Sequence, residues 1–378
     1  MIDPSQSRIL VLSAYDAASH RRWREQLIAA LPHYAWRVLS LPPRFFRWRI
    51  RGNPLSWLDE PLLQERWDLI VASSMVDLAS LRGFHPNLAR VPALLYMHEN
   101  QFAFPVSEGQ HWSAEPQMVN LYSAIAADRV VFNSQWNRMS FLSGVGEFLS
   151  RLPDGVPPGL VDALQAKSDV VPVPIEDRLF VKRTRPLNRK CPHLLWNHRW
   201  EYDKGPDRLL HLLDRLADLG QPFRLSVVGE RFRKQPEAFE KIEARYAEHI
   251  AHFGFIADRA RYERLLVEAD VVISTALHDF QGLSLLEAMA FDCMPLAPDR
   301  LAYPEYVPSP YLYPSHEDDA EKEADAAARC LHNILASPGQ REPPDEWRVS
   351  RVREHYDRII RALLESSRLS AAHPRKIG

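Results

Sequence analysis

Short apolar segments alternate with longer amphipathic segments along most of this chain. In the first half, strands are predicted at residues 8–13, 36–41, 68–73, 93–98 and 129–133. Helical periodicity follows several of them, for example over residues 20–31 and 135–152. Strands that alternate with helices are typical of a parallel sheet covered by helices. The first half therefore predicts an α/β domain.

The same pattern restarts after a proline-rich segment at residues 169–175, which is predicted to be a linker. Further strands are predicted at residues 193–197, 223–228, 251–255, 270–275 and 294–297, and helices at 207–219, 236–249 and 259–268. Two such sets predict two doubly wound, Rossmann-like domains facing across a cleft, with ligands outside the carboxyl ends of the strands.

A chain of 378 residues is long enough for two hydrophobic cores. We expect a first domain over residues 1–175 and a second over residues 176–345. The last segment, residues 346–378, is expected to form a helix that crosses back to the first domain.

Composition adds limits on where the protein acts. Hydrophobic residues make up 46% and charged residues 25%, as in ordinary globular proteins, and the net charge of −2 does not indicate a nucleic-acid binder. Cys191, Cys293 and Cys330 have neither metal-site nor disulfide spacing, which favours a reducing compartment. With no signal-peptide pattern and no bilayer-length apolar window, we expect a cytoplasmic protein without integral membrane association.

The most informative segment runs from His278 to Glu287, between a predicted strand and an apolar helix. Gly282 has no side chain, so a bulky ligand can approach the backbone there. The first helix amides, at Leu283 and Ser284, carry a partial positive charge that suits a phosphate. Glu287 is placed to accept hydrogen bonds from a ribose diol. The pattern predicts a site for a nucleotide whose diphosphate joins it to another group.

Asp279 and Glu287 are separated by seven residues. This spacing resembles the signature of retaining, GT-B-fold glycosyltransferases of family four, in which both positions are usually glutamate. The resemblance implies that Asp279 contacts the donor sugar and that Glu287 binds the ribose. The alternative is a surface aspartate and a helix-capping glutamate beside a chance glycine.

Arg199 and Lys204 lie five residues apart after the first strand of the second half. They resemble the pair with which the same family clamps the diphosphate, and two fixed cations stabilise a departing diphosphate without a metal. No Asp-x-Asp pair occurs, so we expect neither a metal nor a cofactor beyond the nucleotide-sugar substrate. Gly229 resembles the family's next strand-to-glycine turn. The alternative is that the two cations are only solvated.

His98 ends a predicted buried strand, and in the wider family a histidine here touches the donor sugar; the alternative is a structural histidine. Glu99 and Asn100 follow it, and Ser19 and His20 follow the first strand. Together these residues resemble the tRNA-queuosine mannosyltransferase group, which attaches mannose to the cyclopentenediol of queuosine in a tRNA anticodon. The resemblance implies that Ser19, His20, Glu99 and Asn100 lie at the acceptor.

A basic and aromatic segment, predicted to be a loop, occupies residues 41–52, and no acid occurs from residue 41 to residue 58. Arginines reach phosphates and aromatic rings stack on unpaired bases, as recognition of RNA loops requires. The candidates for RNA contact are Arg44, Arg47, Trp48, Arg49 and Arg51. One alternative is an amphipathic loop that packs Phe46 and Trp48 into the core. Another is contact with an anionic membrane surface.

We therefore expect a retaining transferase that moves mannose from GDP-mannose to queuosine in tRNA. No strong base for the acceptor is evident, and the resemblance implies front-face attack with the leaving phosphate receiving the acceptor proton. One alternative is a glycosyltransferase for a lipid, glycan or small-molecule acceptor. Another is a catalytically silent nucleotide- or RNA-binding protein. Nothing in the sequence sets the oligomeric state.

Overall fold

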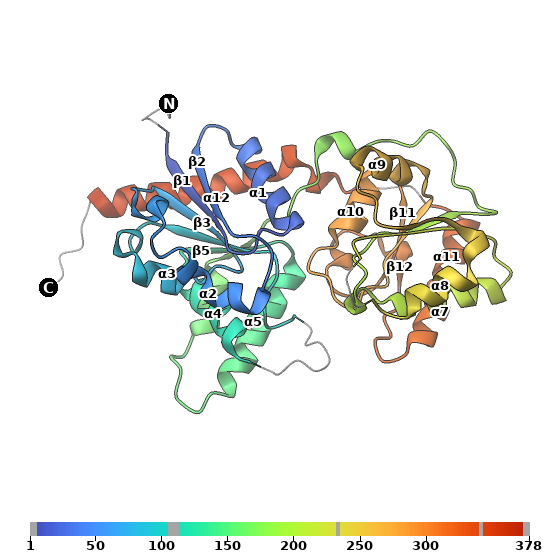
Figure 1. Ribbon diagram of the computed structural model, residues 1–378, viewed down its shortest axis with the longest axis horizontal. Coiled ribbons are helices and arrows are strands. Elements are labelled where there is room, and N and C mark those ends of the chain that lie inside the picture. The colour runs from blue at the N-terminus through green and yellow to red at the C-terminus, as the bar shows by residue number, and fades with distance from the viewer. Residues whose placement is uncertain (1–5, 105–112, 232–234, 340–342, 373–378) are drawn as a thin grey trace. The chain divides into compact units, whose positions relative to one another are not determined.

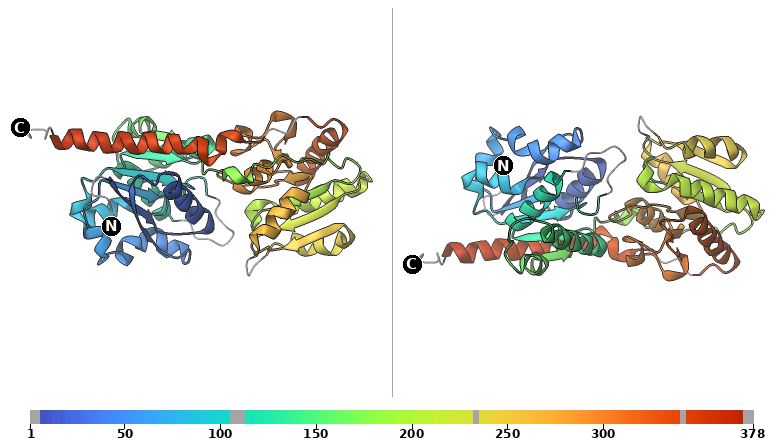
Figure 2. Two further views of the ribbon diagram at one scale, coloured as in Figure 1. Left: turned by 90° about the horizontal axis from the view of Figure 1, so that it is seen from above. Right: turned by 90° about the horizontal axis from the view of Figure 1, so that it is seen from below.

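The computed structural model describes residues 6–104, 113–231, 235–339 and 343–372, so residues 373–378 of the expected C-terminal helix lie outside it. The chain forms two compact units. The first joins Met1–Pro174 with Val349–Gly378, and the second is Ile175–Arg348. Each unit contains one six-stranded sheet, and all the strand pairs are parallel. Helices cover both faces of each sheet (Figures 1 and 2).

The sheet of the first unit has the order β2-β1-β3-β4-β5-β6. Its strands are β1 (Arg8–Ser13), β2 (Ala35–Ser40), β3 (Leu69–Ser73), β4 (Ala93–Met97), β5 (Arg129–Phe132) and β6 (Ser168–Val170). The linker predicted at residues 169–175 is wrong at its start, because residues 168–170 form β6. This strand pairs with β5 at the edge of the sheet. The three short side chains of Ser-Asp-Val gave too little apolar pattern to predict a strand there.

Seven helices of the described chain surround this sheet. They are α1 (Ala18–Ala30), α2 (Phe46–Ser56), α3 (Leu78–Phe84), α4 (Glu115–Ala126), α5 (Gln135–Ser150), α6 (Leu160–Ala166) and α12 (Val349–Ala372). On one face, Tyr96 of β4 packs against Trp23 of α1 and Tyr356 of α12. Trp23 Nε1 also donates to the Tyr356 hydroxyl at 2.9 Å. These contacts hold α12 along the first unit (Figure 2).

The sheet of the second unit has the order β12-β11-β10-β7-β8-β9. Its strands are β7 (His193–Trp196), β8 (Arg224–Val228), β9 (Ile250–Gly254), β10 (Val271–Ile273), β11 (Met294–Pro298) and β12 (Leu312–Tyr313). Its helices are α7 (Pro206–Asp218), α8 (Ala238–Arg245), α9 (Arg259–Glu268), α10 (Leu283–Ala290) and α11 (Ala320–Ala336).

The strand order reverses between two neighbouring strands in each sheet. In the second unit they are β7 and β10, and in the first they are β1 and β3. Doubly wound sheets bind ligands outside the carboxyl ends of such strands, where the two following loops diverge. The loop after β7 carries Arg199 and Lys204, and the loop after β10 carries Asp279. The topology therefore brings these two sequence segments together.

The basic segment at residues 44–51 is mostly helix, although its sequence was interpreted as a loop. α2 contains Pro54, which has no N–H to donate to the carbonyl of Ile50. The side-chain amide of Asn53 replaces that donor, with Nδ2 lying 3.2 Å from the Ile50 oxygen and 2.8 Å from the Arg49 oxygen. The helix therefore tolerates the proline.

Candidate donor site and histidine cluster

The loops after β7 and β10 are bonded to each other through their backbones. Thr275 Oγ1 accepts from Trp196 Nε1 at 2.9 Å and donates to the Lys204 carbonyl at 3.0 Å. The Asp203 carbonyl accepts the amides of Leu277 and His278 at 2.8 and 3.0 Å. Gly205 allows this approach, since a Cβ there would lie 2.1 Å from the Thr275 oxygen. The loop positions are thus set by packing, before any ligand binds.

Lys204 is the central cation of this site. Its Nζ lies 3.3 Å from Asp203 Oδ2 and 3.4 Å from Asp279 Oδ2, and it donates to the His278 carbonyl at 2.6 Å. Burial alone would raise the pKa of Asp279. The charge of Lys204, nearby histidines and the Gly282 amide outweigh burial and lower this pKa to about 2. Asp279 is therefore an ionised, acceptor-only carboxylate at neutral pH.

The start of α10 faces the same place. Gly282 has φ of 76°, in the left-handed region, and its amide donates to Asp279 Oδ1 at 2.9 Å. A Cβ at this glycine would lie 2.2 Å from the Tyr306 hydroxyl. The N-cap residue is this glycine, so it supplies no side-chain cap to the helix. The amides that follow, at Leu283 and Ser284, therefore suit an anion.

His198 lies beside this helix start and was not among the predicted site residues. Its Nδ1 is 3.5 Å from Ser284 Oγ, and its Nε2 has no hydrogen-bond partner among the described residues. Burial, opposed by Asp279 and assisted by Lys204, lowers the pKa of His198 to about 4. His198 is therefore neutral at pH 7, and a ring nitrogen remains for a ligand.

Arg199 differs from Lys204 in its exposure. Half of its side-chain surface is exposed, and Nη1 forms an ion pair with Glu201 Oε2 at 2.9 Å. This surface pair is weak enough to rearrange when a diphosphate is present. Gly229, which was assigned to the donor, lies against the loop backbone, since a Cβ there would be 1.7 Å from the His198 oxygen. The absence of a side chain at Gly229 therefore allows the backbone at His198 to pack against it.

Glu287 is buried and forms an ion pair with Arg259 of α9. Arg259 also contacts Glu263, with Nε lying 2.8 Å from Oε1. The sequence pattern does not predict this arginine, because its 28-residue separation from Glu287 follows no local rule. A cation at this position fixes the orientation of the carboxylate.

The first unit carries a separate cluster of histidines after β4 and β1. The rings of His98 and His20 stack at 4.0 Å with an angle of 15°, and Trp23 meets His98 edge-on at 4.8 Å. Burial, assisted by the charge of His20, places the pKa of His98 well below its ordinary value. Among the described residues, His98 Nε2 has no hydrogen-bond partner. His98 is thus a neutral ring with one nitrogen available.

Glu99 organises the polar edge of this cluster. Its Oε2 lies 3.0 Å from His20 Nε2, and its Oε1 accepts from Ser74 Oγ at 2.7 Å. Ser74 follows β3 and is not among the residues that the sequence predicts for a site. Asn100 is fully buried, and its amide bonds to Asn137, Ser140 and two backbone amides of the next turn. Asn100 thus shapes the loop that carries Glu99.

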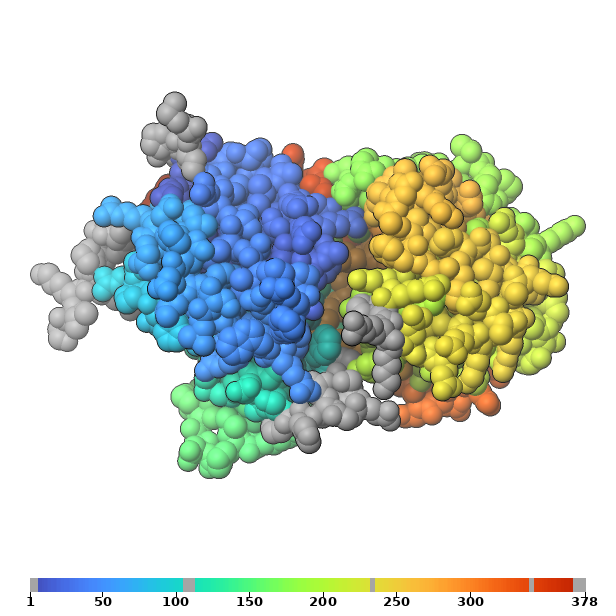
Figure 3. Space-filling model, viewed as in Figure 1, coloured from blue at the N-terminus to red at the C-terminus, as the bar shows by residue number. Residues whose placement is uncertain are grey.

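The predicted RNA-contact residues have unequal surroundings. Arg44, Arg47 and Ser19 are exposed, and Trp48 is 54% exposed. Arg49 is buried, and Arg51 forms an ion pair with Asp77. The alternative in which Phe46 and Trp48 pack into the core is confirmed for Phe46, which packs beside Tyr15. It is wrong for Trp48, which is exposed. α2 lies on the front face of the first unit in Figures 1 and 3.

The described residues contain no group of three His, Cys, Asp or Glu side chains arranged to hold a metal ion. Within the same ranges, every helix is too short or too polar to cross a membrane.

Known proteins resemble both units. Residues 8–175 match the family described as tRNA-queuosine alpha-mannosyltransferase N-terminal, and residues 178–339 match Glycosyl transferases group 1. The tRNA-queuosine alpha-mannosyltransferase of Drosophila melanogaster is 34% identical over 342 residues, which cover 88% of each chain.

Solved structures of lower identity share the fold. Sucrose-phosphate synthase from Thermosynechococcus elongatus has a TM-score of 0.67 at 16% identity, covering 96% of this chain and 100% of that one. Anabaena HepE in complex with UDP-glucose has a TM-score of 0.63 at 15% identity, covering 94% and 99%. The predicted fold class, GT-B with two Rossmann-like units, is confirmed.

Proposed function

This chain belongs to the tRNA-queuosine alpha-mannosyltransferase family and is a glycosyltransferase, and we propose that it transfers mannose from GDP-mannose to queuosine in a tRNA anticodon. The acceptor group is a hydroxyl of the cyclopentenediol, and the configuration of the sugar is retained. The identity of 34% over 88% of the chain carries this proposal. Since tRNA is the acceptor, we place the protein in the cytoplasm.

The second unit would bind the diphosphate of the donor. The amides of Leu283 and Ser284 suit one phosphate, with the open nitrogen of His198 beside them. Lys204 is already held in place, whereas Arg199 has the exposure to move onto the leaving group. These groups stabilise the charge that develops on the diphosphate, and the proposal requires no metal or further cofactor.

Two carboxylates would position the sugar ends of the donor. Glu287, oriented by Arg259, accepts hydrogen bonds from the ribose diol. Asp279 is ionised and accepts hydrogen bonds from mannose hydroxyls. The family resemblance assigns His98 to the donor sugar as well, and its neutral ring suits a hydroxyl.

The reaction needs no dedicated base in this proposal. The acceptor oxygen attacks the anomeric carbon on the face from which the diphosphate leaves. The bond from that carbon to the phosphate oxygen breaks, and the acceptor proton passes to the departing phosphate. Ser19, His20 and Glu99 would orient the cyclopentenediol, because Glu99 and His20 already form one hydrogen-bonded pair. Asn100 would support them through the loop that it shapes.

The deciding experiment is mass spectrometry of nucleosides from tRNA incubated with the enzyme and GDP-mannose. Queuosine-bearing tRNA should yield a nucleoside heavier by one hexose, and the same tRNA with guanosine in place of queuosine should stay unchanged. Unmodified queuosine would refute the acceptor assignment. Transfer to an added lipid or glycan instead would support the alternative acceptors.

α2 offers a second test of the acceptor. The triple variant Arg44→Ala, Arg47→Ala, Trp48→Ala removes exposed groups only, so it should fold normally and weaken tRNA binding about tenfold or more. Arg66→Ala with Arg90→Ala removes two exposed arginines elsewhere on the same unit and should change binding little. Equal losses in both variants would contradict a specific role for α2.

A further inference from the structure

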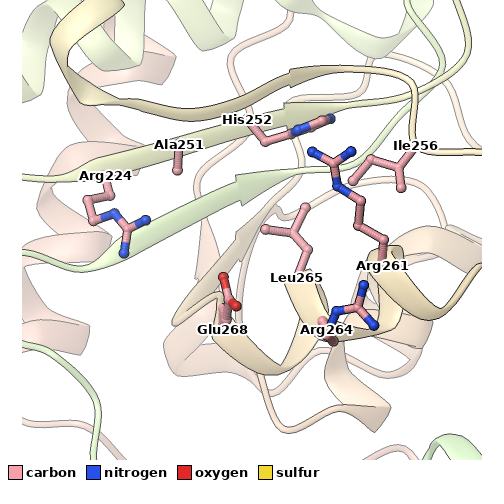
Figure 4. Close-up of a pocket in the computed structure, with 8 residues that line it drawn as sticks. All are labelled: Arg224, Ala251, His252, Ile256, Arg261, Arg264, Leu265 and Glu268. Carbon is pink, nitrogen blue, oxygen red and sulfur yellow. The ribbon is translucent and has the colours of Figure 1, made fainter. Parts of the chain in front are cut away.

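A cavity of about 280 Å³ lies in the second unit, outside the donor site. It opens between the strands β8 and β9 at the edge of the sheet and the helix α9 (Figure 4). Three arginines line it: Arg224 from β8, and Arg261 and Arg264 from α9. None of the roles proposed above uses this cavity.

These arginines lack the acidic partners that several other arginines of the unit have. Arg183, Arg208, Arg245 and Arg300 each form an ion pair with an aspartate or a glutamate. Among the described residues, the guanidinium groups of the three cavity arginines form neither hydrogen bonds nor ion pairs. All three are exposed, and exposed cations without a protein counter-ion around one concavity raise the local positive potential, which attracts an anion.

His252 adds a second sign of an anion site. Figure 4 shows its ring facing the guanidinium of Arg261 across the mouth of the cavity. Burial, and after it the charge of Arg261, lowers the pKa of His252. Its Nε2 is buried without a hydrogen-bond partner in the described chain. An anion between these two side chains would satisfy both of them.

The remaining lining limits the class of ligand. Leu265 and Ile256 supply apolar surface, which suits the flat face of a base or a ribose. Glu268 is the one acid of the lining, and Figure 4 shows it near Arg224. A carboxylate repels a free, doubly charged phosphate, but it accepts a hydrogen bond from a ribose hydroxyl or a base amine. The lining therefore favours a phosphate that carries a nucleoside.

We propose that this cavity binds a phosphodiester and its attached nucleotide in the acceptor RNA, as a contact separate from the anticodon loop. This inference rests on the proposed function. Arginine side chains bind the phosphate oxygens in a bidentate manner, and the apolar floor receives the sugar or base.

The helix α9 would link this contact to the donor site. Arg259 lies two residues before Arg261 on the same helix and forms an ion pair with Glu287. RNA bound at Arg261 and Arg264 would thereby be anchored to the helix that also orients the proposed ribose ligand.

The test measures binding of queuosine-bearing tRNA by fluorescence anisotropy at several salt concentrations. The triple variant Arg224→Ala, Arg261→Ala, Arg264→Ala should raise the Kd about tenfold or more. The slope of log Kd against log salt should fall by about one for each lost phosphate contact. The affinity for GDP-mannose should not change, since none of the three side chains is assigned to the donor.

The matched control removes three exposed, unpaired arginines outside the cavity, with Arg329→Ala, Arg353→Ala and Arg358→Ala. An equal loss of affinity in both triple variants would refute the cavity as a specific site. A loss confined to the cavity variant would support it, as would protection of the His252 ring from titration when RNA is bound.

Inorganic phosphate separates the two sources of the ligand. If phosphate shifts the NMR signals of His252 and tRNA does not compete for it, the cavity binds free phosphate and the RNA proposal is overturned. Failure of the proposed function would give a different result, because the wild-type protein would then leave queuosine unmodified in the nucleoside assay. A cavity variant that binds tRNA normally in an active enzyme refutes only this inference.

Discussion

The loops that follow the sheet strands carry different kinds of side chain in the two units. In the second unit the site is ionic, and Lys204 and Glu287 already have partners of opposite charge. In the first unit the cluster consists of stacked aromatic and imidazole rings, with one carboxylate, Glu99, at its edge. Fixed charges suit the diphosphate that we propose for the second unit, whereas neutral ring nitrogens and one carboxylate suit hydrogen bonds to the diol that we propose for the first.

Different interactions hold the side chains of the two sites in place before a ligand binds. Charges in the second unit compensate one another before the donor arrives, so the loops need no ligand to hold them. Shape and stacking hold the rings of the first unit, and His98 stays neutral because it is buried. Variants should therefore fail in different ways in the two units.

The largest effect is expected from Lys204→Ala. This change leaves Asp203 and Asp279 close together without their common cation, so kcat/KM should fall about a thousandfold and the Tm should also fall. Steady-state kinetics and calorimetry check both effects. Arg199→Ala is the comparison: its half-exposed side chain should cost about a hundredfold in rate with no change in Tm. A fully active Lys204→Ala enzyme would contradict the proposal that Lys204 stabilises the leaving diphosphate.

The second expected effect concerns acid stability. His193, His198 and His278 are buried, and burial is the main cause that lowers the pKa of each to about 4 from 6.5. The unfolded chain binds more protons between pH 4 and 6.5, so the free energy of unfolding should fall as pH drops through this window. At pH 5 the loss should be on the order of 2 kcal/mol for each histidine.

Hydrogen exchange measured at pH 7 and pH 5 would show where this loss occurs. We expect β7 and α10 to lose protection first, and His198→Asn to reduce the dependence on pH. Equal loss of protection in both units would contradict the prediction.

The third expected effect is that Glu99→Gln slows transfer to the acceptor without slowing hydrolysis of the donor. The substitution keeps the size of the side chain but removes the charge beside His20, and transfer to the acceptor should fall about a hundredfold. Hydrolysis of GDP-mannose without acceptor should continue at the wild-type rate, as measured by release of GDP. If both rates fell together, Glu99 would belong with the donor residues.

The smallest effect is expected from Glu287→Gln. The proposed ribose contact would be the same in the ground state and the transition state, so the KM for GDP-mannose should rise about tenfold with kcat unchanged. Glu263→Gln removes the other carboxylate that contacts Arg259 and should alter neither constant. A fall in kcat for Glu287→Gln would indicate a role in the chemical step.

Much of the fold could be predicted from periodicity. The ranges predicted for β1 and α9 agree with the structure to the residue, because both segments have a clear pattern and distinct ends. The errors have local causes. β6 has only three residues at a sheet edge, and α2 contains a proline whose effect Asn53 offsets through a side-chain bond.

The site residues divide in the same way. Lys204, Asp279 and Gly282 lie in loops after neighbouring strands, so motif and topology were enough to bring them together. Arg259 and Ser74 could not be found, because their partners depend on how helices and loops pack far along the chain. His198 had a usable signal, since it directly follows the strand predicted at residues 193–197 and precedes Arg199.

The first unit is discontinuous in sequence, and this affects how the protein is made. The boundary residues Ile175 and Arg348 form an isolated β-bridge, and the Ile175 amide donates to the Trp347 carbonyl at 2.7 Å. The inner segment is therefore complete on the ribosome while the outer one still lacks α12 and its contact between Tyr356 and Trp23. The part of the protein that is synthesised first would then finish folding last.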